Sequence, residues 1–205
     1  MATSYVGTFD AIRDVTETLR DVLRAGFQIA PVINADCEAH DLTTTIGVPP
    51  PRPLLTVTLY DVVEDPGARN RPNERRYVPG PPARIVMTRP PASLLLRYLL
   101  TPWSGDPFSD QRVLGRAVQM LYDNAIISGP DLRGSLFGRD ESVQVTMAPL
   151  SLEDRTHVWR SINANYRLSV NYEVRVVHIE TRRELAAAPP VRRRSLDHAT
   201  REGLP

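Results

Sequence analysis

The side chains best suited to catalysis or metal binding are four histidines and a single cysteine. Their spacing matches no known catalytic site. His40, His157, His178 and His198 are scattered along the 205 residues. Cys37 stands three residues before His40, and an aspartate flanks the pair on each side. This is half of a metal-ligand pattern without its second half. We therefore expect neither a metal ion nor a cofactor.

Paired carboxylates are the other candidates for chemistry. Glu38, Asp61 and Glu64 could serve as an acid and a base, although acids at such spacings occur by chance in most chains. The sequence has no Gly-x-Ser-x-Gly elbow, no His-Glu-x-x-His pair and no glycine-rich dinucleotide turn. We expect no catalytic residue. A small-molecule enzyme whose pocket the sequence does not reveal stays as an alternative.

The basic residues exclude several reaction classes. All 25 of them are arginines, and lysine is absent. A Walker-type phosphate loop, a pyridoxal Schiff base and a kinase-type catalytic lysine are therefore excluded. The formal net charge of +1 gives no overall nucleic-acid or membrane signature. Arginine favours planar, bidentate pairing across protein interfaces.

Two polar segments are candidates for binding. The arm, residues 64–82, contains Arg69, Asn70, Arg71, Arg75 and Arg76. The last strand and the C-terminal tail contribute His178, Arg182, Arg183, Arg192, Arg193 and Arg194. Only Tyr77 lies near the arm to stack on a base, so protein contact is favoured over nucleic acid, with a solvated loop as the remaining alternative.

The element that organises the chain is an alternating run over residues 166–180. Apolar side chains occupy one parity, namely Tyr166, Leu168, Val170, Tyr172, Val174 and Val176. Polar side chains occupy the other, namely Arg167, Ser169, Asn171, Glu173 and Arg175. This period predicts one long strand with a core face and a polar face. Such a strand is long enough to reach past the domain body, so its end beyond Val176 is a candidate for pairing with another chain.

The remaining pattern predicts three helices and several further strands. Helices are expected at residues 8–26 with Thr8 as the cap, from Asp106-Pro107 onward, and after Ser151. Strands are expected at 42–48, 54–63, 83–87, 93–101 and 141–147. Because several strands follow one another without helices, the sequence predicts an α/β (α+β) fold with a mixed, mainly antiparallel sheet flanked by about three helices.

The domain organisation follows from these elements. We expect a single α/β domain over residues 1–183, with the extended arm at 64–82, and a Pro/Arg-rich tail at 184–205 that is disordered when alone. No apolar run approaches the roughly 20 residues of a membrane span, and the start lacks a signal-peptide pattern. One cysteine fits a reducing compartment, so a cytoplasmic protein is expected.

Six runs in order resemble a known family. They are Leu59-Tyr60, 68–70, 94–100, 113–118 with 121–123, 149–153 with Trp159, and 166–170 with Tyr172-Glu173. Together, over residues 8–180, they are similar to the N-terminal domain of the cap, or tail-terminator, proteins of phage-tail-like contractile injection systems of the virulence-cassette and antifeeding-prophage type.

The resemblance implies a structural role. Such a protein has a tail-terminator-like fold with a long C-terminal strand and extended arms, is not an enzyme, and needs no cofactor. It forms a sixfold ring at the distal end of the inner tube and contractile sheath. Its partners are then further copies of itself, the sheath protein and the inner tube protein, without nucleic acid or membrane, and it ends in the assembled particle. A baseplate or tube-initiating component of the same particle is the alternative.

Overall fold

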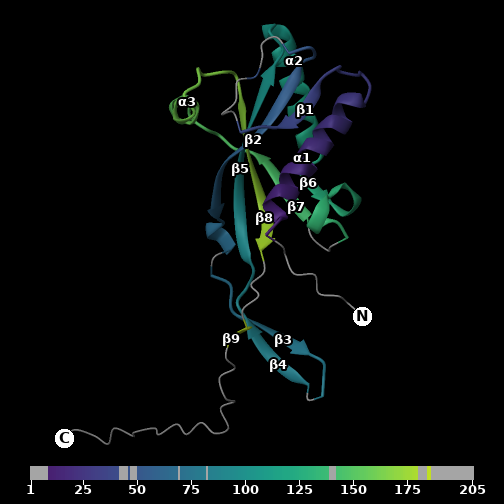
Figure 1. Ribbon diagram of the computed structural model, residues 1–205, viewed down its shortest axis with the longest axis vertical. Helices are drawn as coiled ribbons and strands as arrows, with labels where there is room; N and C mark the ends of the chain where they lie inside the picture. The colour runs from purple at the N-terminus through teal and green to yellow at the C-terminus, as the bar shows by residue number, and fades with distance from the viewer. Residues whose placement is uncertain are drawn as a thin grey trace, which may run out of the picture.

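The computed structural model describes residues 9–41, 46, 50–68, 70–81, 83–138, 142–179 and 184–185. Within them the chain forms three α-helices and two sheets (Figure 1). The helices are α1 (Ala11–Gln28), α2 (Pro107–Asp123) and α3 (Leu152–Ser161). Short 3-10 turns occur at Pro66–Ala68, Gly129–Asp131 and Gly134–Leu136.

The larger sheet has six strands in the order β1-β2-β5-β8-β7-β6. The strands are β1 (Asp36–Ala39), β2 (Leu54–Glu64), β5 (Ala92–Trp103), β6 (Ile126–Ser128), β7 (Ser142–Met147) and β8 (Val170–Ile179). Every neighbouring pair is antiparallel except β1 with β2. The predicted α+β class with a mixed, mainly antiparallel sheet is therefore confirmed.

The sheet is covered on both faces. Helices α1 and α2 lie on one side and α3 on the other (Figure 1). Side chains of α1 that recur at helical spacing, among them Val15, Leu19 and Leu23, are fully buried in the main core with Tyr98 of β5. Between α3 and the sheet, Trp159 forms a second, smaller cluster. Burial of an apolar side chain of this kind contributes about 1.5–3 kcal/mol.

Two of the predicted helix starts are confirmed. Asp106 caps α2, because its Oδ2 accepts a hydrogen bond from the backbone N–H of Ser109 at 2.8 Å. Ser151 caps α3 in the same way, accepting from the backbone N–H of Asp154 at 3.0 Å. Helix α1 begins at Ala11 rather than at residue 8, and the predicted cap Thr8 lies outside the described residues.

Two β-bulges interrupt the long strands. Leu59 pairs with Tyr98 and Asp61 with Arg97, so that Tyr60 is an extra residue in β2. In β8, two residues between Val174 and Val177 lie opposite the single residue between Leu96 and Leu94. A bulge of this kind lets consecutive side chains share one face and breaks strict alternation beyond it.

The long C-terminal strand differs from its prediction in two ways. It begins at Val170, so Tyr166 and Leu168, which are 41% and 46% exposed, precede it. Tyr172 and Val174 are buried in the core as predicted. The opposite face, predicted to be polar and to meet water or a partner, is instead covered at its start by α3 and the segment around Ala148.

Ser169 and Asn171 are both buried on that opposite face, at 1% and 4% exposure. Beyond the bulge the parity changes, and Ile179, on the parity predicted to be polar, packs against the main core. The alternation therefore identifies the core residues correctly only where the strand is regular.

The arm contains more regular structure than its composition suggests. Its residues Glu74–Val78 form β3, which pairs with β4 (Arg84–Thr88) in a hairpin. Strand β9 (Glu184–Leu185) adds to β4 and completes a three-stranded sheet. This smaller sheet lies beyond the lower ends of the long strands (Figure 1).

Strands β1, β6 and β9 were not predicted, since each has four residues or fewer, and β3 was not predicted because it lies in the polar arm. The predicted strand at 42–48 falls almost entirely outside the described residues.

Candidate interaction surface

A stripe of charged side chains crosses three strands of the larger sheet. Arg97 of β5 donates through Nη1 to Asp61 Oδ2 of β2 at 2.9 Å and through Nε to Glu173 Oε1 of β8 at 3.2 Å. Glu173 also accepts from Arg175 Nη2 at 3.0 Å. Two carboxylates and two guanidinium groups thus form one network, which we call the charged stripe.

The register of the strands explains the charged stripe. Asp61, Arg97 and Glu173 lie directly opposite one another across β2, β5 and β8, and the bulge at Tyr60 gives Asp61 its place in that row. Burial lowers the pKa of Arg97, but its hydrogen bonds with Glu173 and Asp61 outweigh burial and raise the pKa above the ordinary value. The stripe is an internally neutralised surface and offers no free acid-base pair.

The hydroxyl of Tyr60 links the bulge in β2 to the start of β8. It donates to Oδ1 of Asn171 at 2.7 Å, while Nδ2 of Asn171 donates to the carbonyl of Ala148 at 3.4 Å. Sequence reasoning missed this pair because Asn171 shares its parity with polar and charged residues. The signal that could have revealed it is the apolar cluster of α3, which needs a face of the sheet to cover.

The structure brings some of the predicted binding residues together. Arg71 of the arm approaches His178 of β8, with 3.5 Å between Nη1 and Nε2. Arg75 lies opposite Met87 in the hairpin, and Asn70 is exposed. The arm and the end of the long strand are therefore neighbours, as a shared binding surface would require.

The other predicted binding residues are not placed. Arg69, Arg182, Arg183, Arg192, Arg193 and Arg194 lie outside the described residues, and the side chain of Arg76 is also not described.

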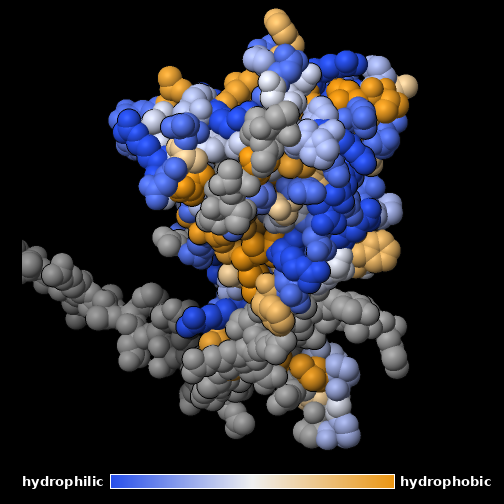
Figure 2. Space-filling view, turned by 45° about the horizontal axis from the view of Figure 1, so that its top comes forward, coloured by the Kyte–Doolittle hydropathy of each residue, from blue (hydrophilic) through white to orange (hydrophobic). Residues whose placement is uncertain are grey.

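The hairpin also exposes apolar side chains. Tyr77 of β3 and Ile85 of β4 lie directly opposite each other and are 66% and 61% exposed. Figure 2 shows hydrophobic surface on this projecting hairpin and, more extensively, over the long strands in the middle of the same face. A cross-strand aromatic and aliphatic pair left in solvent is typical of an interaction site. Sequence reasoning did not select Ile85, because its partner could be recognised only from the hairpin register.

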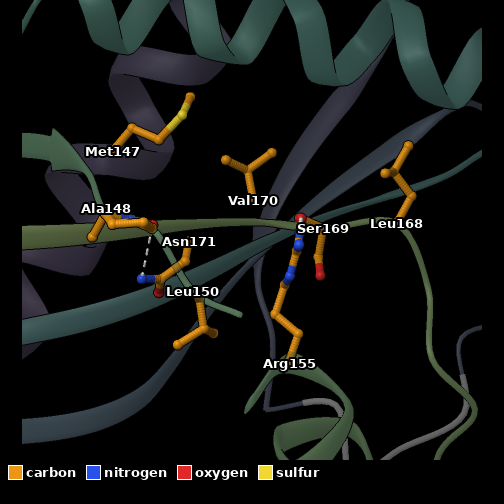
Figure 3. A pocket seen from close by; sticks show the side chains of 9 residues that line it. Met147, Ala148, Leu150, Arg155, Leu168, Ser169, Val170 and Asn171 are labelled. Atoms are coloured by element: carbon orange, nitrogen blue, oxygen red, sulfur yellow. Dashed lines mark hydrogen bonds between the residues drawn. The ribbon is translucent and has the colours of Figure 1, made fainter. Parts of the chain in front are cut away.

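A hollow of about 460 Å³ lies between the end of β7 and the start of β8. Figure 3 shows Arg155 rising from α3 toward Ser169, whose carbonyl accepts from Arg155 Nη1 at 3.2 Å. The lining residues are Met147, Ala148, Pro149, Leu150, Arg155, Leu168, Ser169, Val170 and Asn171. No carboxylate, histidine or cysteine is among them. Ser169 contributes a hydroxyl, but its Oγ donates to the carbonyl of Arg167 at 3.2 Å, and no lining side chain is a base that could activate it.

The surroundings of Cys37 and His40 give no second half to their metal-ligand pattern among the described residues. Cys37 is fully buried in the main core, and burial raises the pKa of its thiol to about 12. A thiol in this state is protonated at neutral pH and is not a nucleophile. Among the described residues, no three His, Cys, Asp or Glu side chains are grouped so that they could hold a metal ion.

We expect Cys37 to be unreactive in the folded protein. At pH 8, a thiol with a pKa near 12 has a thiolate fraction about a thousandfold below that of an ordinary cysteine, and burial also blocks access. Colorimetric titration with a disulfide reagent should detect no thiol until denaturant is added. Tyr122→Cys, at an 83% exposed position on α2, is the matched control and should react at once. Rapid reaction of the parent protein would contradict the burial of Cys37.

In the part of the chain that the structure describes, no helix combines the length and the hydropathy needed to cross a bilayer.

Comparison with known proteins gives two kinds of match. The family model for the Pvc16 N-terminal domain matches residues 14–193. The fold is similar to a sheath/tube terminator of PVC, an extracellular contractile injection system, in the extended state. That match has 22% identity and a TM-score of 0.58, and covers 94% of this chain and 65% of that one. A comparison with curated proteins gave no match.

A second similar structure is the cap of the anti-feeding prophage, the AFP tube terminating cap. It shows 21% identity and a TM-score of 0.56, and the match covers 95% of this chain and 63% of that one. The chain thus spans just under two thirds of the length of each of these structures. The two matches confirm the predicted tail-terminator-like fold.

Proposed function

Because the chain belongs to the Pvc16 N-terminal domain family, we propose that it is a structural cap, or terminator, of a contractile injection particle. In this role, copies of the chain form a ring at the distal end of the inner tube and the contractile sheath. The ring ends polymerisation of the tube and stabilises the sheath. The observation that carries the proposal is the match of nearly the whole chain, 94%, to a structure described as a sheath/tube terminator.

The partners follow from this role. We propose a hexamer of this chain that contacts the sheath protein and the inner tube protein and becomes part of the particle end after synthesis in the cytoplasm. The exposed Tyr77–Ile85 pair and the neighbouring Arg71 and Arg75 are the contacts that we assign to the hairpin. Arginine with an aromatic side chain is the combination enriched in protein interfaces.

The chemistry of the described residues supports a structural role over catalysis. The charged stripe is neutralised within the chain, Cys37 is a buried thiol, and no carboxylate, histidine or cysteine lines the hollow beside α3. We therefore propose that the chain is not an enzyme. About a third of each similar terminator structure lies outside its match to this chain, and no role of that part belongs to this proposal.

The test is removal of the chain from a cell that produces the particles. We expect tubes of irregular length, or sheaths that contract early and are poorly recovered, as seen by negative-stain microscopy. A tagged copy should label only the particle end opposite the baseplate. Particles of normal length and stability would contradict the proposal, and label at the baseplate would favour the baseplate alternative.

A further inference from the structure

We infer that two open strand edges, one on β2 and one on β8, pair with each other between neighbouring copies of this chain. The β2 edge is the side of Thr58–Val63 that faces away from β5. The β8 edge is the side of Val176–Ile179 that faces away from β5. The inference deepens the proposed function, and it rests on that function for the ring.

Among the described residues, the β2 edge has no strand partner past Val57, because β1 is short. Strand β1 pairs with β2 only at Leu54–Val57, and the backbone N–H of His40 makes the last bond to this side, to the carbonyl of Val57 at 3.1 Å. Past that point, no described strand lies beside Thr58–Val63 on this side. A strand edge of this kind presents a row of backbone N–H and C=O groups that can pair with another strand.

The β8 edge begins where the pairing between β7 and β8 ends. The last pair between the two strands is Gln144 with Arg175. Strand β8 continues to Ile179, which pairs with Ala92 of β5. Among the described strands, β5 is therefore the sole neighbour of Val176–Ile179. In the described part of the chain, the lower part of the larger sheet therefore consists of β2, β5 and β8, and neither β2 nor β8 has a further strand partner there.

Strand direction decides how two copies can meet. Strands β2 and β8 are both antiparallel to β5, so they are parallel to each other. In a ring whose axis runs along the strands, every copy points the same way. The β8 edge of one copy then meets the β2 edge of the next in a parallel pair. Because the two edges are different surfaces on opposite sides of one sheet, this contact is head-to-tail and can close into a ring.

Charge favours this pairing over pairing of like edges. The β2 edge carries Asp61, whereas His178 lies within the β8 edge and Arg175 stands immediately before it. The side chains of Asp61 and Arg175 are 37% and 48% exposed, so each retains surface for a neighbour besides its partner within the chain. Two β2 edges would bring acids together, and two β8 edges would bring basic groups together. Val62, 41% exposed, would also be covered by the neighbouring copy.

Hydrogen exchange of the purified full-length protein tests the inference. Amide exchange is compared between a dilute monomeric sample and a concentrated assembled one. We expect the amides of residues 58–63 and 176–179 to exchange at about one tenth of the monomer rate in the assembly, or at a lower rate, because they gain hydrogen-bond partners. Strand β6, Ile126–Ser128, is the internal control at another edge and should not change.

Cross-linking identifies the partner of each edge. Val63→Cys and His178→Cys are made separately in the parent, whose own Cys37 is buried. A short bismaleimide should link the two variants only when they are mixed, and the double variant should give a ladder of oligomers. Tyr122→Cys on α2 is the matched control and should not link to Val63→Cys.

The outcomes separate this inference from the proposed function. If the chain assembles and its amides are protected at one edge alone, or at neither, the pairing is overturned. The terminator role is then decided by where the tagged copy labels the particle. Linkage of Val63→Cys to itself overturns the head-to-tail arrangement. A chain that stays monomeric at every concentration overturns the pairing between copies, whereas label at the particle end would still support a terminator.

Discussion

Replacing Val174 by aspartate should unfold the protein. Val174 is completely buried in the main core, at the centre of β8. A carboxylate there would lose its hydration without gaining a partner, at a cost of several kcal/mol. Since a domain of this kind is stable by about 5–15 kcal/mol, we expect a loss of most or all of the cooperative thermal transition. Circular dichroism on heating measures it.

Gln144→Asp is the matched control for this substitution. Gln144 is exposed on β7, directly opposite Arg175, so a new carboxylate there has water and a cation beside it. Its effect should stay within about 0.5 kcal/mol. Equal melting temperatures for the two variants would show that β8 does not present Val174 to the core.

Replacing Asn171 by aspartate should destabilise the protein strongly at neutral pH. Asn171 is 4% exposed, and its amide nitrogen donates to the carbonyl of Ala148 at 3.4 Å. A carboxylate would place a negative oxygen against that carbonyl and would keep only the bond from Tyr60. We expect a loss of about 2–3 kcal/mol, measured by urea denaturation.

The loss in Asn171→Asp should depend on pH with a defined sign. Burial raises the folded-state pKa of the new carboxyl above its unfolded value of about 3.9, because desolvation disfavours the charged form. The penalty is therefore absent below that unfolded pKa, where the acid is protonated in both states. It grows as pH rises, until the folded-state pKa is reached. The difference in melting temperature from the parent should widen between pH 4 and pH 7.

Tyr60→Phe is the matched control for Asn171→Asp. It removes only the hydroxyl that donates to Asn171 at 2.7 Å, so it should cost about 1 kcal/mol with no dependence on pH in this range. A neutral effect of Asn171→Asp at pH 7 would show that α3 leaves this face of β8 open to solvent.

The periodic elements of the fold could be predicted from the sequence. Helix α2 is specified by Asp106-Pro107 and a regular apolar stripe, and β5 by an almost continuous apolar run, because local geometry and burial act together in both. The short strands β1 and β6 have too few residues for a period to be recognised. The bulges depend on pairing between distant segments, so alternation along one strand contains no signal for them.

The candidate surface could be predicted in part. The arginines of the arm indicated where the chain extends, and Arg71 indeed lies beside His178. The charged stripe was not foreseen, although an arginine in the middle of the apolar run of β5 marks it. Its position requires Asp61 and Glu173 to lie opposite Arg97, which only the register of three strands provides.

The extra residue in β2 determines where this strand can lose a residue while its later side chains keep their faces. Losing the codon for Tyr60 would let Leu59 and Asp61 follow each other as Tyr98 and Arg97 do on β5, so every later side chain of β2 would keep its face. Losing a codon elsewhere in the regular part of the strand would turn every later side chain to the opposite face. The bulge is thus a place where β2 can lose one residue and keep its later register with β5, with loss of the Tyr60–Asn171 bond.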